Sequence, residues 1–176
     1  MPVTEFLERN ANLYPNDIAL VEINPATQTR RHWKDFNLVE SSQLFYRSQI
    51  SWQVFNEKAN RCANFLISRG IGKGDNVALI MYNSIDWLPI YFGILKAGAV
   101  AVPFNFRYSA DEISYCANLA QVKLIFFGAE FIGRIEAIFN SLNIDFVFVG
   151  DFCPSFALPF FFLTANFSGE GLRIRF

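Results

Sequence analysis

The sequence predicts an α/β fold in which a parallel β-sheet is flanked by helices. Two observations lead to this prediction. From residue 51 onward, short and almost continuous apolar runs alternate with segments whose apolar residues recur at helical spacing, and glycines separate many of these segments. Continuous apolar runs are typical of strands covered on both faces, and strands that alternate with helices through short links form parallel sheets. The expected strands are Val77–Tyr82, Val100–Pro103, Leu124–Phe127 and Phe146–Val149.

The region before this alternation is less regular. Thr4 is suited to cap a short helix that runs through Ala11. The apolar run Ile18–Ile23 predicts a strand. Residues 24–49 are polar and irregular, so we expect them to form an insertion or a long loop.

Capping residues and glycines set the bounds of the next two helices. Ser51 is a suitable N-cap for a helix through Ile67, and Gly70 stands where a left-handed C-cap residue is needed. The following helix is expected to end at Gly98. Its candidate caps are Asn83, Ser84 and Asp86. Its apolar face is expected to contain Leu88, Phe92 and Leu95.

Two more helices complete the predicted alternation. Ser109 and Glu112 have the spacing of a capping box, in which each side chain satisfies a free backbone N–H of the first turn. The buried face of this helix is expected to hold Ile113, Cys116, Ala117 and Ala120. The last helix is marked by Ile132, Ile135, Ile138, Phe139 and Leu142.

Residues 151–176 form an irregular tail that is rich in phenylalanine and has no clean period of either kind. An exposed segment this apolar would promote association. We therefore expect the tail to pack on a neighbouring surface. Two surfaces are open for this role: the remaining part of a larger protein, and a second copy of the chain.

Composition excludes several classes of partner. Hydrophobic residues make up 52% of the 176 residues, enough for a single well-packed domain. The net charge is −1, and the 15 basic residues are mixed with 16 acidic ones, so no basic stripe exists to bind nucleic acid. No apolar run approaches the roughly 20 residues of a membrane-spanning helix, and the first residues do not resemble a signal peptide. A cytoplasmic protein is expected.

Cysteine and histidine usage argues against a structural metal site. Cys62, Cys116 and Cys153 are far apart in the sequence, and His32 is the single histidine. A zinc site needs four clustered ligands, so this set does not predict one. The cysteines fit a reducing compartment in which thiols behave as small hydrophobic groups.

No catalytic constellation is visible in the residues themselves. Gly70–Gly74 is glycine-rich, but a helix enters it and a strand leaves it, the reverse of a phosphate loop, so a tight turn is expected. His32 lies among polar residues, where a solvated or partner-facing side chain is expected. Asp111 and Glu112 are adjacent on a helix and do not face each other, which favours capping over acid–base work. We assign no catalytic, cofactor-binding or metal-binding residue.

Four stretches carry a resemblance to a known family. Residues 94–103, ILKAGAVAVP, resemble the LKAGAxxVP stretch of the adenylate-forming superfamily, which includes acyl-CoA synthetases, luciferases and peptide-synthetase adenylation domains. Residues 50–61, ISWQVFNEKANR, resemble that family's early helix, and residues 74–78, GDNVA, resemble its GDxVA strand entry. Residues 105–113, NFRYSADEI, are similar to a stretch typical of the acyl-CoA synthetase branch.

The resemblance implies that residues 1–176 are a partial AMP-dependent synthetase/ligase domain, an incomplete portion of the large N-terminal domain of adenylate-forming enzymes. It also implies that Gly93 and Gly98 permit close approach of helix to sheet, and that Pro103 ends an edge strand. The family's SGTTGxPKG-type ATP loop does not occur in the 176 residues, nor do its later ribose-binding aspartate and catalytic lysine motifs.

Full-length members of the family convert a carboxylic acid and MgATP to an acyl-adenylate, from which CoA displaces AMP. The resemblance therefore implies a truncated fragment of a fatty-acid or other carboxylic-acid:CoA ligase. ATP, Mg²⁺ and CoA are expected for the full-length family and are not assigned to this fragment. Alone, the chain is expected to be inactive. The alternatives are a non-catalytic interaction module, one half of a split ligase, and a stand-alone nucleotide or acyl binder.

Overall fold

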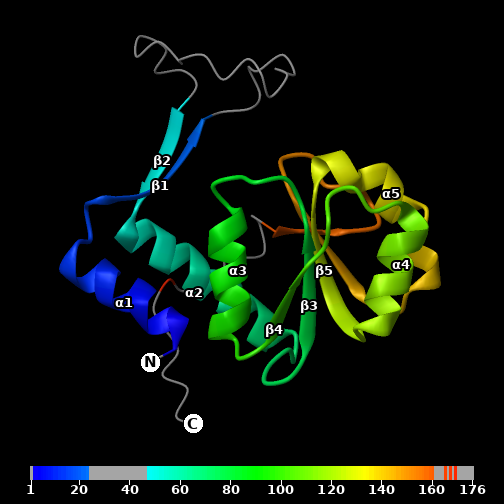
Figure 1. Cartoon of the computed structure of the whole chain (residues 1–176), viewed down its shortest axis with the longest axis horizontal. Coiled ribbons are helices and arrows are strands. Elements are labelled where there is room, and N and C mark those ends of the chain that lie inside the picture. The colour runs from blue at the N-terminus through cyan, green and yellow to red at the C-terminus, as the bar shows by residue number, and fades with distance from the viewer. Residues whose placement is uncertain (1, 24–46, 161–164, 166, 168, 170–176) are drawn as a thin grey trace.

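The structure is a computed structural model that describes residues 2–23, 47–160, 165, 167 and 169. At the centre of the described part lies a parallel sheet with the strand order β4–β3–β5–β6–β7 (Figure 1). Every neighbouring pair in this sheet is parallel, as predicted, and all four predicted strands belong to it. The bounds are β3 Asn76–Ile80, β4 Val100–Pro103, β5 Val122–Gly128, β6 Asp145–Val149 and β7 Leu158–Pro159.

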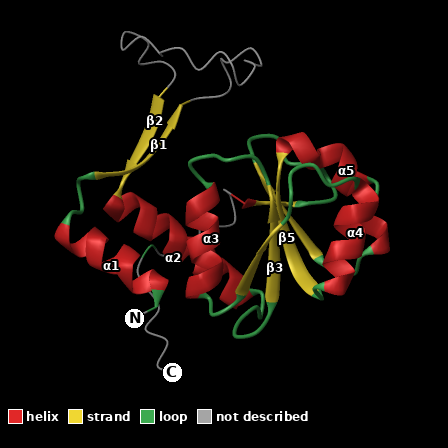
Figure 2. Ribbon diagram, viewed as in Figure 1, coloured by secondary structure: helices red, strands yellow, loops and turns green. Residues whose placement is uncertain are grey.

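Helices cover both faces of the sheet, as Figure 2 shows. One face carries α2 (Trp52–Ser68) and α3 (Trp87–Lys96), and the other carries α4 (Ala110–Leu119) and α5 (Ile132–Glu136). The central strand β3 alternates between the two layers. Val77 and Leu79 belong to the core beneath α2 and α3, while Ala78 and Ile80 belong to the core beneath α4 and α5. Both faces of β3 are therefore buried, which explains its continuous apolar sequence.

The amino-terminal region packs beside α2 and α3. α1 (Val3–Leu13) follows Pro2 at the N-cap position, so the prediction that Thr4 caps this helix is wrong. Proline needs no N–H partner and is suited to a helix start. β1 (Ile18–Ile23) is confirmed, and it pairs antiparallel with β2 (Arg47–Ser51).

The existence of β2 corrects the predicted insertion at residues 24–49. The last three residues of the predicted insertion, 47–49, belong to β2, and residues 24–46 lie outside the described residues. The sequence of β2, RSQIS, is polar and has exposed positions at Ser48 and Gln49. A strand with solvent-exposed polar residues in a two-stranded ribbon resembles a loop in composition. The hydropathy pattern therefore did not predict β2.

The predicted bounds of α2 and α3 largely hold. The Val54 N–H donates to Ser51 Oγ at 3.3 Å, which confirms the N-cap. Gly70 has a φ of 75° and Gly98 a φ of 80°, so both occupy the left-handed region that ends a helix. Asp86 takes the N-cap position of α3 but makes no capping bond; it pairs with Lys58 instead.

The buried face of α3 differs from the predicted one. Ile90, Gly93 and Ile94 are buried, and the predicted residues are only half-buried. α3 turns its smallest residue, Gly93, toward α2, and a Cβ built on Gly93 would lie 2.5 Å from the Cβ of Cys62. Gly93 therefore permits a close helix–helix contact, not the helix–sheet approach that the resemblance implied.

On the opposite face, the capping box of α4 is confirmed. Ile113 and Ala117 are buried, whereas Cys116 and Ala120 are half-buried. The last predicted helix is divided into α5 and a 3₁₀ turn at Phe139–Ser141. The Ser141 hydroxyl donates to the Ile138 carbonyl at 2.7 Å, a local bond that competes with continued helix.

Several described residues of the tail pack on this chain's own core, and for those residues the expectation of a neighbouring surface is wrong. Phe160 is 6% exposed, and its ring centroid lies 5.5 Å from that of Phe126 in β5. The Phe156 ring stacks on that of Phe139 at 5.0 Å. β7 lies between Phe156 and Phe160 in the sequence and pairs with the outer side of β6. Phe152, in contrast, is 90% exposed.

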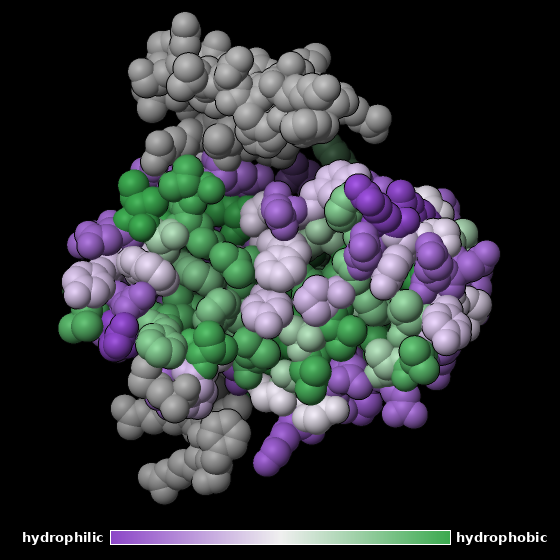
Figure 3. Space-filling model, in the orientation of Figure 1, coloured by the Kyte–Doolittle hydropathy of each residue, from purple (hydrophilic) through white to green (hydrophobic). Residues whose placement is uncertain are grey.

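The surface polarity is uneven. Figure 3 shows apolar side chains gathered where the β1–β2 ribbon meets α2 and α3, while the side of α4 and α5 is mostly polar. None of the helices in the described ranges is both long and apolar enough to cross a bilayer.

Candidate functional site

The strand order places a topological switch point between β3 and β5. The chain passes from β3 to β4 on one side, and later from β5 to β6 on the other. In open parallel sheets the loops diverge at such a point, and ligands bind in the crevice beyond the carboxyl ends of the strands. The residues that follow β3, β4 and β5 at this edge are therefore the first candidates for a site. We call Tyr82, Phe106, Arg107, Glu130 and Arg134 the carboxyl-edge cluster.

Aromatic rings form the floor of this cluster. The Tyr82 ring meets the Phe106 ring at a centroid distance of 5.8 Å and the Phe131 ring at 5.7 Å, both nearly edge to face. Phe131 is 1% exposed, whereas Tyr82 is 54% and Phe106 is 48% exposed. The exposed Phe106 ring thus packs on the Tyr82 ring, and the Tyr82 ring packs on one ring anchored in the core. Such a surface offers a large apolar contact area at low entropic cost.

A carboxylate fixes the backbone at the end of β3. Glu130 Oε1 accepts the Tyr82 N–H at 2.8 Å. The side chain folds back over Gly128, where a built Cβ would lie 2.9 Å from the other carboxylate oxygen. Glycine at this position leaves space for the carboxylate to reach across from the end of β5. The ends of β3 and β5 are thereby joined at the switch point.

The loop that carries Arg107 is held by several hydrogen bonds. Asn105 Oδ1 accepts the Arg107 N–H at 2.9 Å, and the Asn105 carbonyl accepts the Tyr108 N–H at 3.0 Å. Arg134 Nη1 donates to the Phe106 carbonyl at 2.8 Å and to the Tyr108 carbonyl at 3.0 Å. The backbone on both sides of Arg107 is therefore fixed, although its side chain is exposed.

The charge of this edge is carried by the two arginines and Glu130. The Arg107 guanidinium lies 5.4 Å from the Phe106 ring centroid, and no carboxylate of the described residues forms an ion pair with it. The neighbouring Cys116 raises the pKa of Tyr108, so that hydroxyl stays protonated at neutral pH. An exposed cation beside aromatic rings can bind an anionic or planar group.

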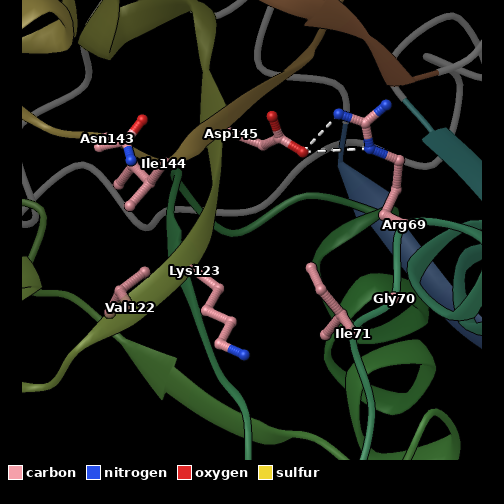
Figure 4. A pocket seen from close by; sticks show the side chains of 8 residues that line it. All are labelled: Arg69, Gly70, Ile71, Val122, Lys123, Asn143, Ile144 and Asp145. Carbon is pink, nitrogen blue, oxygen red and sulfur yellow. Dashed lines mark hydrogen bonds and ion pairs between the residues drawn. The ribbon is translucent and has the colours of Figure 1, made fainter.

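A second depression lies at the opposite edge of the sheet, where β5 and β6 begin (Figure 4). Its volume is about 450 Å³. Arg69 donates to Asp145 Oδ2 through Nε at 3.0 Å and Nη2 at 2.6 Å, and Lys123 pairs with Asp75 at 2.7 Å. Lys123 also lowers the pKa of the Asp75 carboxyl through this hydrogen bond. The charges are paired with each other, and ligands of parallel sheets bind at the other edge. We assign no ligand to this depression.

The residues of the family-like stretches have a structural role. Lys96 Nζ, whose side chain is 8% exposed, donates to Glu8 at 2.7 Å and to the side-chain oxygens of Asn56 and Asn60 at 2.9 Å each. Asn60 Nδ2 in turn donates to the Gly169 carbonyl at 2.8 Å. We call this set the Lys96 joint. It connects α3 with α1, α2 and the tail, and it contains no reactive group aimed at a crevice.

The other motifs that the sequence singled out also have structural roles where they are described. Gly70–Gly74 forms the turn between α2 and β3, with Gly74 at a φ of 86°, as predicted. Glu112 accepts the Ser109 N–H at 2.7 Å, which confirms capping. His32 lies outside the described residues. Within the described ranges, no group of three or more histidine, cysteine, aspartate or glutamate side chains could hold a metal ion.

Sequence reasoning missed the carboxyl-edge cluster. Tyr82, Glu130 and Arg134 lie on separate elements, and no short motif connects them. The available signal was positional: Tyr82 and Glu130 stand at or just after the carboxyl ends of predicted strands, the place where parallel sheets bind ligands. Arg134 lies further along, in α5, and had no such signal.

A sequence profile of the family described as "AMP-binding enzyme" matches residues 7–147. The chain belongs to this family. The match covers most of the central sheet and both helical layers, together with most of α1 and the β1–β2 ribbon. The adenylate-forming resemblance carried by the LKAGA and GDNVA stretches is thereby confirmed.

Similar curated proteins include CoA ligases. The chain is 41% identical over 90 residues to the long-chain-fatty-acid–CoA ligase FadD13 of Mycobacterium tuberculosis, a stretch that covers 51% of this chain and 18% of the ligase. It is 39% identical over 94 residues to the crotonobetaine/carnitine–CoA ligase of Citrobacter koseri, which covers 53% and 18% of the two chains. The matched stretches span less than a fifth of these relatives.

Solved structures give the same family and the same fold. A Mycobacterium tuberculosis fatty acyl CoA synthetase matches with a TM-score of 0.73 at 25% identity, covering 98% of this chain and 30% of the synthetase. The inhibitor-bound N-terminal domain of FACL13 from the same organism matches with a TM-score of 0.71 at 26% identity, covering 97% and 37%. The predicted likeness to the amino-terminal part of an acyl-CoA synthetase is confirmed.

Proposed function

We propose that this chain is an amino-terminal segment of a carboxylic-acid:CoA ligase whose acid substrate is a fatty acid. The observation that supports this most is the 41% identity to a long-chain-fatty-acid–CoA ligase, within a family match over residues 7–147. The reaction proposed for the whole enzyme has two steps. A carboxylate oxygen attacks the α-phosphorus of ATP and releases pyrophosphate; the CoA thiol then attacks the acyl carbon and AMP leaves.

In this proposal the described residues supply a frame and one binding edge. The carboxyl-edge cluster presents the Arg107 guanidinium and two exposed rings at the switch point, where it would contact an anionic part of a substrate. The Lys96 joint holds α3 against α2 and thereby fixes the layer that supports β3 and β4. Mg²⁺ would come with ATP in the whole enzyme, and we assign no magnesium ligand among the described residues.

Adenylation by residues 1–176 alone is not expected. The family's ATP loop and its catalytic lysine motif do not occur in this sequence. Each preorganised group that stabilises developing charge is typically worth several kcal/mol in the transition state. We also propose that residues 1–176 form one partial domain, and that the three free cysteines reside in the reducing cytoplasm.

The experiment is complementation by separate chains. Residues 1–176 are mixed with the remaining part of the mycobacterial ligase, expressed separately, and acyl-CoA formation from a long-chain fatty acid is measured. Activity of the mixture, with none from either part, supports a ligase segment. No activity from a mixture that forms a stable complex would contradict the proposal. Carboxylate-dependent exchange of pyrophosphate into ATP by the chain alone would contradict the expected inactivity.

A stand-alone interaction module is the second candidate, and the tail favours it. Phe160 is buried against β5, and Phe167 packs on Phe65 of α2 with a centroid distance of 6.2 Å. These contacts place two tail phenylalanines against the chain's own core. A monomeric, cooperatively folded chain that neither complements nor binds the ligase remainder would support this candidate. Concentration-dependent dimers abolished by Phe152→Ser would instead support self-association through the tail.

A further inference from the structure

We propose that Arg134 is a positioning residue that holds the loop 105–109, and with it Arg107, at the carboxyl edge. The inference rests on the proposed function only for the anion that Arg107 would contact. Arg134 itself points its guanidinium at backbone carbonyls and is not a ligand contact. Nothing in the local sequence of α5 indicates this role, since Arg107 and Arg134 are 27 residues apart.

The geometry carries the inference in three steps. Phe131 is 1% exposed and anchors the edge to the core. The Arg134 guanidinium lies over the Phe131 ring, with its Cζ 5.2 Å from the ring centroid. Nη1 then bridges the carbonyls of Phe106 and Tyr108, the residues on either side of Arg107. A continuous chain of contacts thus runs from the core to the backbone that flanks Arg107.

The chemistry requires arginine at this place. A planar guanidinium can stack on an aromatic ring while its N–H groups point along the same plane to two acceptors. Hydrogen bonds from a charged donor are stronger than neutral ones. A lysine would retain the charge but could not stack a planar group on the ring in this way. Arg134→Lys therefore separates the effect of the positive charge from the effect of the planar guanidinium.

A loop fixed in this way is prepared to bind. The Asn105 side chain and the Ser109–Glu112 capping box hold its two ends, and Arg134 holds the middle. Ordering such a loop on binding costs affinity, and a loop that is already ordered avoids this cost. Removal of Arg134 should therefore weaken binding at Arg107 without removing any group that contacts the ligand.

The test uses inorganic pyrophosphate as a simple anionic probe and the full 176-residue chain, followed by NMR of backbone amides. Wild type, Arg107→Gln, Arg134→Gln and Arg134→Lys are compared. Arg69→Gln is the matched control, because it removes the same charge at the opposite edge of the sheet. We expect amide shifts at residues 106–108 in wild type. Both substitutions of Arg134 should accelerate hydrogen exchange of this loop and weaken binding by about tenfold, and Arg69→Gln should change neither.

Each outcome bears on the inference. Unchanged loop exchange in Arg134→Gln, or wild-type behaviour of Arg134→Lys, would overturn it. If Arg134→Gln does not fold, Phe131→Leu keeps a buried apolar side chain but removes the stacking ring, and it should loosen the loop in the same direction. A third outcome is faster loop exchange in both Arg134 variants, with no amide shift near Arg107 when pyrophosphate is added to wild type. It would support the positioning role and would contradict only the proposed anion contact.

Discussion

Gly93 of α3 and Cys62 of α2 lie so close that a Cβ on Gly93 would come within 2.5 Å of the Cys62 Cβ and 2.7 Å of its Sγ. Cys62 is fully buried, and burial raises the pKa of its thiol, so it acts as a small neutral side chain in this contact. The closest approach of the two helices on this face thus depends on the absence of one methyl group.

Gly93→Ala should destabilise the chain by about 1–3 kcal/mol, because an added methyl must displace the α2 backbone or its side chains. The measurement is the free energy of unfolding from urea titration. Gly133→Ala is the matched control: nothing lies within 4 Å of a Cβ built there, and alanine is the better helix former. Equal stability of the two variants would contradict the tight contact.

Lys96→Met should lower the free energy of unfolding by about 2–4 kcal/mol, because it leaves the oxygens of Asn56 and Asn60 without their donor in a region of low exposure. Lys123→Met is the comparison, since its ion pair with Asp75 is exposed and worth at most about 1 kcal/mol. Circular dichroism on urea titration distinguishes the two. A Lys96 variant as stable as the Lys123 variant would mean that the joint is not a stabilising contact.

The capping box predicts a specific acid response. Hydrogen bonds from the Ser109 N–H and hydroxyl lower the pKa of Glu112 below its usual value of about 4.3. A lowered folded-state pKa gives stability that is present above the unfolded value and is lost as pH falls through the folded one. Glu112→Gln keeps a side chain able to accept the bond but does not titrate. Its unfolding free energy should therefore fall less steeply than wild type below about pH 4, and parallel acid profiles would contradict this.

The tail offers two phenylalanines in opposite environments. Phe160→Ala should cost about 3–5 kcal/mol, because the ring is buried against Phe126. Phe152→Ala should change stability by no more than about 0.5 kcal/mol, because its ring is 90% exposed. Thermal and urea unfolding of both variants test this. A neutral Phe160 variant would restore the initial expectation that the tail packs on a surface outside this chain.

Local patterns predicted the elements whose cause is local. The Ser109–Glu112 box and the left-handed glycines at 70 and 98 follow from the needs of helix ends, and β3 follows from burial on both faces. β2 was not predicted because its polar residues face solvent. The buried face of α3 was not predicted because the helix is apolar on nearly all sides, so its apolar residues do not mark one face.

The contacts within the candidate site were not predictable from sequence, for a different reason. Tyr82 and Glu130 are joined across 48 positions, and Arg134 reaches loop carbonyls 28 and 26 positions away. Every residue has a backbone carbonyl, so the sequence does not indicate which carbonyl a distant side chain will bind. Such contacts become visible only when the strand order has set the ends of β3, β4 and β5 side by side.

The Lys96 joint has a consequence for how proteins of this kind are recognised. Three residues of the family-like stretches, Lys96 of LKAGA and Asn56 and Asn60 of the early helix, help to set how α1, α2 and α3 meet. A search based on these residues recognises a structural framework and gives no information on catalytic residues. Such a search groups a working ligase with a chain that has only the same framework. Residues outside the Lys96 joint are needed to distinguish a working ligase from a chain with the framework only.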